Sequence, residues 1–175
     1  MGWVIDRART RIGFSVKHML VSTARGEFTR YQAQLEIDRD DFTRSSCAGS
    51  IEVDSLDTGS AERDSLLRSH GILGGAQHPR MMFQSTQVRR VSAQRYVVSG
   101  QLTLRGIQKP VELDVSFAGV TRDAAGRELA HLQVRGVVSR KAFGVSFGVL
   151  EAGGISVGDK VNLELDVLAV ADEAQ

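Results

Sequence analysis

The sequence predicts an all-β fold, an eight-stranded antiparallel barrel with one short helical insertion. Three observations support this prediction. Apolar and polar residues alternate with a period of two through most of the 175-residue chain, which is typical of strands with one buried face. Turn-forming residues separate the alternating runs, and only one stretch has a helical pattern. Closing such a sheet into a barrel removes its exposed edges.

Eight runs of alternation account for most of the chain. In the first run, Ile12, Phe14, Val16 and His18 share one face of the predicted strand. The last run is the most regular, because every second residue from Val161 onward is aliphatic. We predict strands at residues 11–18, 31–37, 47–54, 81–88, 96–104, 111–117, 132–138 and 161–167.

The connections between the runs are turns, with one exception. Residues 105–109 are short enough to join two runs as a hairpin. Residues 60–70 are the exception, because Leu66 and Leu67 lie on one side among charged residues. Ser60 is a suitable N-cap and Gly71 a suitable stop, so we predict a short helix there.

Composition and charge argue against several classes of function. The formal net charge is +1 and acidic residues are interspersed with short arginine clusters, so we expect no nucleic-acid partner. The single cysteine, Cys47, permits neither an intrachain disulfide nor a thiolate metal cage. No apolar stretch approaches the roughly 20 residues of a transmembrane helix, and the N-terminus lacks the features of a signal peptide. We therefore expect one domain over residues 1–175, located in the cytoplasm.

Two features of the sequence are candidates for a catalytic or metal site: a G-x-S-x-G pattern and the histidines. Residues 144–148 fit the G-x-S-x-G pattern of a nucleophile elbow, but no histidine follows Ser146 in the chain. The histidines show no metal-ligand spacing, so we expect no metal and no cofactor. His18 shares a face with Phe14 and Val16 and should therefore point inward. It is either a core histidine with a hydrogen-bond partner, a contact to a ligand head group, or a proton-transfer residue.

The interior of the predicted barrel is the main functional question. An eight-stranded barrel either is filled by its own side chains or leaves room for one small ligand. Several small residues fall at inward positions and favour a hollow interior. These residues are Ala33, Gly49, Gly100 and Gly136.

A series of motifs in a fixed order resembles the YceI family of lipid- and polyisoprenoid-binding proteins. The motifs are Trp3-Val4-Ile5-Asp6, Phe14 to His18, Gly26 and Phe28, Ser55 to Gly59, Arg63-Asp64, Leu67-Arg68-Ser69, Pro79, Phe83, Ser85-Thr86, Gly100 to Gly106, Lys109-Pro110-Val111, Leu113, Ser139-Arg140, Phe143-Gly144 and the strand from Val161. Each motif is weak alone, but together they cover nearly the whole chain. The chain departs from the family at Ile72-Leu73, where the family usually has two adjacent aromatic residues.

The resemblance implies a lipocalin-like barrel with a long internal cavity, a lipid ligand, a possible homodimer and no catalysis. From the alternation we expect these residues to line the cavity: Phe14, Val16, His18, Phe28, Ile51, Leu67, Phe83, Leu102, Leu104, Val111, Leu113 and Phe143. Polar residues at one mouth would contact the head group, with Asp57, Arg63, Asp64 and Arg140 as candidates beside His18.

Four functions are therefore in competition. The first is a carrier or storage protein for a long-chain polyisoprenoid or similar amphiphilic lipid. The second is a small enzyme of isoprenoid metabolism that uses His18 with Asp57 or Asp64 for proton transfer. The third is a protein that sequesters lipophilic toxins or antibiotics. The fourth is a filled barrel that acts only as an interaction module.

Overall fold

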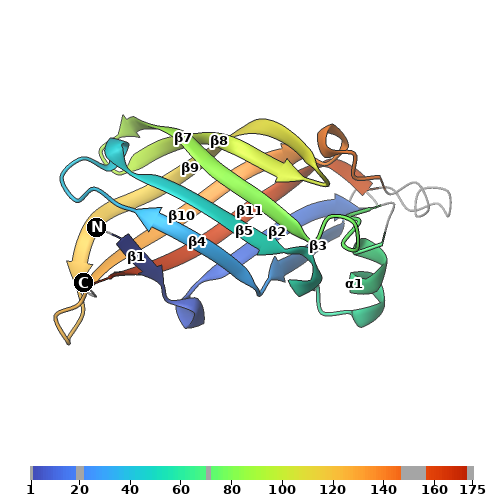
Figure 1. Cartoon of the computed structure of the whole chain (residues 1–175), viewed down its shortest axis with the longest axis horizontal. Helices are drawn as coiled ribbons and strands as arrows, with labels where there is room; N and C mark the ends of the chain where they lie inside the picture. Colours follow the sequence, from blue (N-terminus) through green and yellow to red (C-terminus); the bar gives the residue numbers. More distant parts are fainter. Residues whose placement is uncertain (1, 19–21, 70–71, 147–156, 173–175) are drawn as a thin grey trace.

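The computed structural model describes residues 2–18, 22–69, 72–146 and 157–172. Within these residues, eleven strand segments form one antiparallel sheet that is accompanied by one α-helix (Figure 1). The strands are β1 (Gly2–Ile5), β2 (Arg11–His18), β3 (Ser22–Phe28), β4 (Tyr31–Glu36), β5 (Ser46–Glu52), β6 (Leu56–Asp57), β7 (Arg80–Ser92), β8 (Arg95–Leu104), β9 (Ile107–Arg122), β10 (Glu128–Ser139) and β11 (Val157–Ala171). The helix is α1 (Ala61–Leu67), and the 3-10 turns are η1 (Arg7–Arg9), η2 (Phe42–Arg44), η3 (Val53–Ser55) and η4 (Lys141–Phe143).

The eleven segments make eight barrel strands, because three pairs of segments continue one another. β1 and β2 both pair with β11 and are separated only by η1. β3 pairs with β2 and β4 pairs with β1, so β3 and β4 are two parts of one barrel strand. β6 pairs with β3 and β5 pairs with β4, so β5 and β6 are two parts of the next barrel strand. Eleven segments less three interruptions leave a closed eight-stranded antiparallel barrel, which confirms the predicted fold class.

The last strand closes the barrel against the first. β11 pairs with β10 along most of its length, from Leu129↔Val170 to Ser139↔Lys160. On its other side, β11 pairs with β2 around Leu163↔Phe14 and with β1 at Trp3↔Ala171. The sheet therefore continues around the full circumference of the barrel.

The wall has one local interruption, between the first two barrel strands. Their pairing stops after Trp3↔Leu35 and resumes at Ile12↔Phe28. Arg7 bridges this gap, because its guanidinium donates a 2.8 Å hydrogen bond to the carbonyl of Tyr31 and lies 4.7 Å from the centre of the Tyr31 ring. A side chain thus replaces the missing ladder hydrogen bonds.

Glycines on the inner face make room for large neighbouring side chains. A Cβ placed on Gly26 would lie 2.6 Å from the Phe14 ring, and one on Gly100 would lie 2.4 Å from the Phe83 ring. The Phe14 ring of β2 therefore packs over β3, and the Phe83 ring of β7 packs over β8. Of the small inward residues expected to favour a hollow interior, Gly100 instead accommodates an aromatic ring.

The predicted hairpin and helix are present, although the turn is shorter than residues 105–109 and the helix ends at Leu67, while the predicted stop at Gly71 lies outside the described residues. Three strand segments were missed. Arg105 and Gly106 form the predicted hairpin turn with positive φ angles of 54° and 73°, as a two-residue type I′ turn requires. Ser60 caps α1 by accepting a hydrogen bond from the backbone of Arg63. The sequence analysis did not predict β1, β3 or β6. In β3, Ser22–Phe28, charged and small residues leave Phe28 as the single large apolar residue, so alternation is hard to detect.

Candidate lipid-binding cavity

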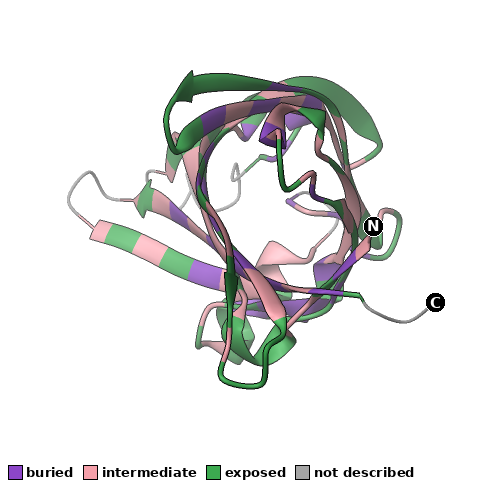
Figure 2. Cartoon of the chain, turned by 90° about the vertical axis from the view of Figure 1, so that its left-hand side faces the viewer, coloured by how far each residue is buried: buried purple, intermediate pink, exposed green. Residues whose placement is uncertain are grey.

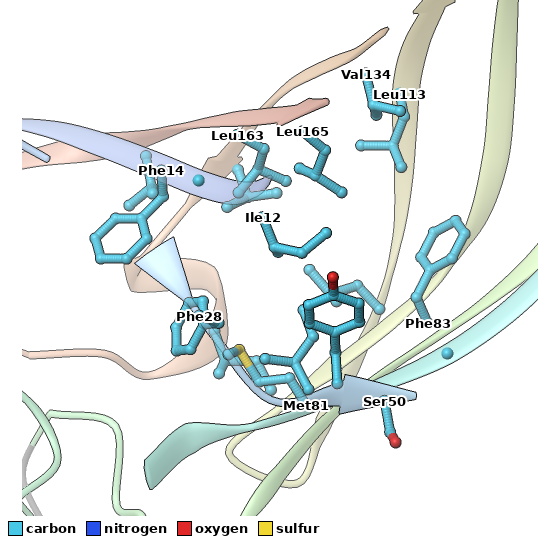
Figure 3. Close-up of a pocket in the computed structure, with 18 of the residues that line it drawn as sticks. Ile12, Phe14, Phe28, Ser50, Met81, Phe83, Leu113, Val134, Leu163 and Leu165 are labelled. Carbon is cyan, nitrogen blue, oxygen red and sulfur yellow. The ribbon is translucent and has the colours of Figure 1, made fainter. Parts of the chain in front are cut away.

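The barrel encloses one large cavity of about 1090 Å³. Side chains from most of the strands and from α1 line it, and the great majority of them are aliphatic or aromatic. Figure 3 shows Ile12, Phe14, Phe28, Phe83, Leu163 and Leu165 arranged around this space. The cavity exceeds the roughly 300–1,000 Å³ of most small-molecule sites.

The inward side chains in the middle of the barrel are only half-buried, which is why the interior is hollow. Phe14, Val16, Leu113, Leu163 and Leu165 all line the cavity and keep part of their surface accessible. In a filled barrel these positions would be fully buried by contact with the opposite wall. Figure 2 views the closed sheet from the end that carries the termini, and the cavity lies inside this sheet. The cavity therefore argues against the alternative of a filled barrel.

An aromatic cluster closes one end of the cavity. Phe42, in η2, lies with its ring centroid 4.6 Å from that of Tyr96 and 4.6 Å from that of Phe117. All three side chains are at most 8% exposed. This end carries both termini and the connection between β4 and β5 (Figure 1). The cluster separates the cavity from solvent at this end.

The opposite end carries α1 and most of the polar lining residues. The apolar part of this end is a cluster of Ile72, Leu104, Phe143 and Val145, against which Leu66 and Leu67 pack. Polar side chains from β2, α1 and the loop preceding α1 also line the cavity here. They are His18, Thr58, Ser60, Glu62, Arg63, Ser65 and Ser69. The cavity is therefore amphipathic along its length.

Most of the residues predicted to line the cavity do so. Phe14, Val16, His18, Phe28, Ile51, Leu67, Phe83, Leu102, Leu104, Val111 and Leu113 all border it. Phe143 does not. Its side chain is 2% exposed and packs in the apolar cluster behind the wall, because η4 turns it away from the strand register. Whether the bordering residues contact a ligand stays a prediction.

The polar mouth candidates have different environments. Arg63 lines the cavity, and its guanidinium donates to the hydroxyl of Thr58 at 2.8 Å and to the Thr58 carbonyl at 2.6 Å. Asp64 is buried and accepts hydrogen bonds from the backbone and hydroxyl of Thr58, so it stabilises the loop before α1 rather than bordering the cavity. Asp57 is exposed and accepts from the backbone of Gly59.

Arg140 lines the cavity but serves mainly as a structural clamp. Its side chain is 4% exposed. The guanidinium donates hydrogen bonds to the carbonyls of Val145, Val157 and Gly158 at 2.8–3.0 Å. These bonds tie the loop after η4 to the start of β11. Arg140 therefore holds this end of the wall, and its contact with a head group stays a prediction.

His18 lacks the carboxylate partner that an acid–base role requires. Within the described residues, no hydrogen bond or ion pair holds its imidazole. Asp64 is committed to Thr58, and Asp57 faces solvent. The predicted pair of His18 with Asp57 or Asp64 is thus absent from the described part of the chain. Its imidazole borders the cavity without a partner among the described residues.

Some lining residues were missed by the sequence analysis. Alternation places Ile12, Leu163 and Leu165 on the inner face, so the same signal could have identified them. No strand pattern could have identified Phe42 or Ile72, because both lie in connections. Their positions depend on how those connections fold back over the barrel ends.

Cys47 is a titratable group on the cavity wall. Burial raises the pKa of its thiol, and the hydroxyl of Ser85 opposes this shift. Among the residues that the structure describes, no cluster of histidine, cysteine, aspartate or glutamate could hold a metal ion.

Comparison with known proteins identifies the family. The profile of the YceI-like domain matches residues 3–169. The chain belongs to the YceI family. Among its YceI relatives, a UPF0312 protein of Staphylococcus epidermidis is 30% identical over 161 residues, which cover 91% of each chain. A UPF0312 protein of Staphylococcus aureus is 29% identical over 164 residues, which cover 93% of each chain.

Solved YceI structures share the barrel. The Campylobacter jejuni YceI protein superimposes with a TM-score of 0.77 at 26% identity, covering 97% of this chain and 98% of that one. Burkholderia cenocepacia BcnA has a TM-score of 0.82 at 21% identity, covering 94% and 99% of the two chains. A polyisoprenoid binding domain from Saccharophagus degradans, implicated in plant cell wall breakdown, has a TM-score of 0.71 at 13% identity and covers 98% of each chain. The last two matches establish the fold alone.

In the described ranges, no helix is long and apolar enough to cross a bilayer.

Proposed function

We propose that this barrel binds one long-chain polyisoprenoid or a similar amphiphilic lipid in its cavity, as a carrier, storage or sequestering protein. The observation that carries this proposal is the cavity itself, about 1090 Å³ in volume and lined by half-buried apolar side chains. Apolar surface that faces a cavity in the empty protein is stabilised when hydrocarbon covers it. The cavity therefore suits a long hydrocarbon chain rather than a compact polar metabolite.

The affinity of such a site should grow with the length of the lipid. At about 0.3 kcal/mol per non-hydrogen atom for larger ligands, one five-carbon isoprene unit adds about 1.5 kcal/mol. That increment corresponds to about tenfold in affinity per unit. The gain stops when the chain fills the cavity, because any further carbon stays in water.

The distribution of polar residues sets the orientation of the lipid. His18 and Arg63 border the cavity at the α1 end, whereas Phe42 closes the other end. Ser45 and Ser46 also border the cavity beside Phe42, but the α1 end offers more polar groups, including the guanidinium of Arg63, that can replace the hydrogen bonds of a polar head to water. The head group therefore lies at the α1 end and the tail extends toward the aromatic cluster.

The fold comparison supports a lipid ligand. The Saccharophagus degradans domain is described as polyisoprenoid binding, and its fold matches this chain along 98% of its length. Because that identity is 13%, the comparison supports the architecture of the site and not the choice of lipid.

Mass spectrometry of an organic extract from the freshly purified protein tests the proposal. Native mass spectrometry of the intact chain gives the stoichiometry in parallel. A stoichiometric lipid with a long apolar chain is the expected result, and its mass gives the chain length and head group together. A protein that is empty and also takes up no added prenyl alcohol would contradict the proposal.

Cys47 offers a built-in reporter of cavity occupancy. The thiolate is the reactive form of cysteine. Because burial raises the pKa of Cys47, its thiol should react slowly with N-ethylmaleimide at neutral pH. The rate should increase at a pH above the usual pKa range of cysteine. Bound lipid should slow this reaction in proportion to the fraction of protein loaded. Alkylation followed by mass spectrometry measures both effects.

The control for this experiment is a cysteine on the outer face. A Cys47→Ser chain that also carries Ser116→Cys places the thiol at an exposed position of β9. Its labelling rate should be the same with and without lipid. If wild-type Cys47 reacts equally fast in loaded and empty protein, the lipid does not occupy this part of the cavity.

Several expectations from the sequence stay predictions. They are the single domain, the cytoplasmic location, the homodimer, and the lack of a nucleic-acid partner. Sequestration of lipophilic toxins or antibiotics requires the same cavity and differs from carriage only in the breadth of ligands. A role in catalysis has no supporting geometry in the described residues, since His18 lacks an acidic partner there.

A further inference from the structure

We propose that Phe42 sets the maximum length of the lipid tail by forming the end wall of the cavity. This inference rests on the proposed function, because it specifies which lipids the same site accepts. It assigns a specificity-determining role to a residue in a connection between strands, outside the barrel wall. Three features support this role: the Phe42 ring faces the cavity, other aromatic rings pack behind it, and hydrogen bonds hold the turn that carries it.

Phe42 is the layer of the aromatic cluster that faces the cavity. Its side chain lines the cavity, whereas those of Tyr96 and Phe117 do not. The ring of Phe42 stacks on Phe117 at an interplanar angle of 29° and meets Tyr96 at 53°. A lipid tail that extends from the α1 end therefore meets the Phe42 ring first, and that ring has a second aromatic layer behind it.

Local hydrogen bonds hold η2 in its folded-back position. Asp41 accepts hydrogen bonds from the backbone and hydroxyl of Thr43, at 3.0 and 2.6 Å, and thereby caps η2. Asp38 accepts from the backbone of Asp40 and Asp41, both at 2.9 Å. The segment that carries Phe42 is therefore a compact turn, and it presents the ring to the cavity in one defined position.

A bridge across the same end of the barrel, to the start of β10, fixes this turn. Arg39 donates to both carboxylate oxygens of Glu128 in β10, at 2.5 and 2.8 Å. Its guanidinium also lies 5.4 Å from the centre of the buried Trp3 ring. Bidentate arginine–carboxylate pairs fix geometry as well as adding energy. The end wall is thus connected to β1 and β10 and does not depend on the β4–β5 connection alone.

The size of the Phe42 ring matches one unit of the expected ligand. Replacing phenylalanine with alanine removes six ring carbons, and one isoprene unit contains five carbons. Phe42→Ala should therefore let the cavity accept about one further isoprene unit, which is worth about tenfold in affinity for a chain of that length. Phe42→Trp adds bulk at the same place and should shorten the accepted tail.

The experiment measures affinity for a homologous series of all-trans prenyl alcohols, from farnesol upward in steps of one isoprene unit. In the wild type, affinity should rise about tenfold per unit and then level off at a limiting length. For Phe42→Ala the limit should move up by about one unit, and for Phe42→Trp it should move down. Phe42→Leu, with a side chain of intermediate size, should fall between the wild type and Phe42→Ala.

The outcomes separate this inference from the proposed function. If the wild type binds no member of the series, the proposed function fails. If the wild type shows a limiting length and the folded Phe42→Ala, Phe42→Leu and Phe42→Trp variants all keep it, Phe42 does not form the end wall. A uniform loss of affinity at every length in a folded variant, without a moved limit, would also overturn the inference, because the limiting length would then not depend on Phe42.

Discussion

Leu163→Asp should abolish lipid uptake, whereas Asn162→Asp should leave it unchanged. Leu163 lines the cavity from β11, and its side chain points into the space that the lipid would occupy (Figure 3). In the empty barrel a carboxylate at this position stays hydrated. Hydrocarbon that fills the cavity would remove that water, at a cost of several kcal/mol for an unpaired charge. We expect affinity for a prenyl alcohol to fall by about 100-fold or more.

Asn162 supplies the matched control for this change. It is adjacent in β11 but on the outer face, since successive residues of a strand point to opposite sides. Both variants gain the same charge on the same strand, so any difference between them reports which face the charge occupies. Uptake of lipid by a folded Leu163→Asp protein at the wild-type level would show that the hydrocarbon lies elsewhere.

Arg140→Met should lower the free energy of unfolding by about 3 kcal/mol. Methionine approximates the length and apolar character of the arginine stem but donates no hydrogen bonds. The carbonyls of Val145, Val157 and Gly158 then lose their charged donor at a buried position. Urea denaturation of the variant and the wild type measures the difference directly.

An exposed arginine provides the comparison for Arg140→Met. Arg95, at the start of β8, is exposed, so Arg95→Met should change stability by no more than about 0.5 kcal/mol. Arg140→Lys keeps the positive charge but not the three-way geometry, and its stability should lie between that of the wild type and that of Arg140→Met. A loss below about 1 kcal/mol for Arg140→Met would contradict the clamp, because each bond to a charged group is worth roughly that much or more.

The sequence predicts the barrel well because alternation is a local signal. β10 and β11 combine an apolar inner face with polar residues outside, and each appears as a regular pattern in the sequence. β3 was missed because Gly26 and Ala24 replace large residues on its inner face, where Phe14 lies across Gly26. A strand whose inner residues are small, so that a neighbouring side chain can pack over them, no longer shows the alternation of apolar and polar residues that predicts a strand.

Proline position shows a second limit of local patterns. The strand predicted over residues 111–117 begins earlier, so Pro110, which precedes the predicted strand, lies inside β9 and pairs with Gln101. The missing N–H does no harm there, since the β9–β10 pairing extends only as far as Asp114. Whether Pro110 can lie inside the strand depends on how far the pairing with β10 extends, and the sequence around Pro110 does not contain this information.

The candidate site was predictable to the extent that it lies in the wall. Phe14, Leu102 and Leu113 follow from alternation, whereas the end wall at Phe42 depends on a turn whose path the sequence pattern does not specify. Arg140 was predicted at the right place, but its structural role was not predicted. A conspicuous cation near a mouth suggests a head-group contact, but its hydrogen bonds to carbonyls become visible only once η4 and β11 are positioned together.

Closure by the last strand has a consequence for how the protein acquires its contents. Trp3 pairs with Ala171, and Phe14 pairs with Leu163, so the final wall segment joins residues from opposite ends of the chain. Contacts of such long sequence separation form late and slowly during folding. Until they form, the apolar inner faces of the other strands remain open to their surroundings. We expect a lipid that adheres to these faces to be enclosed when β11 docks, so that a newly made barrel samples the lipids present where its chain folds.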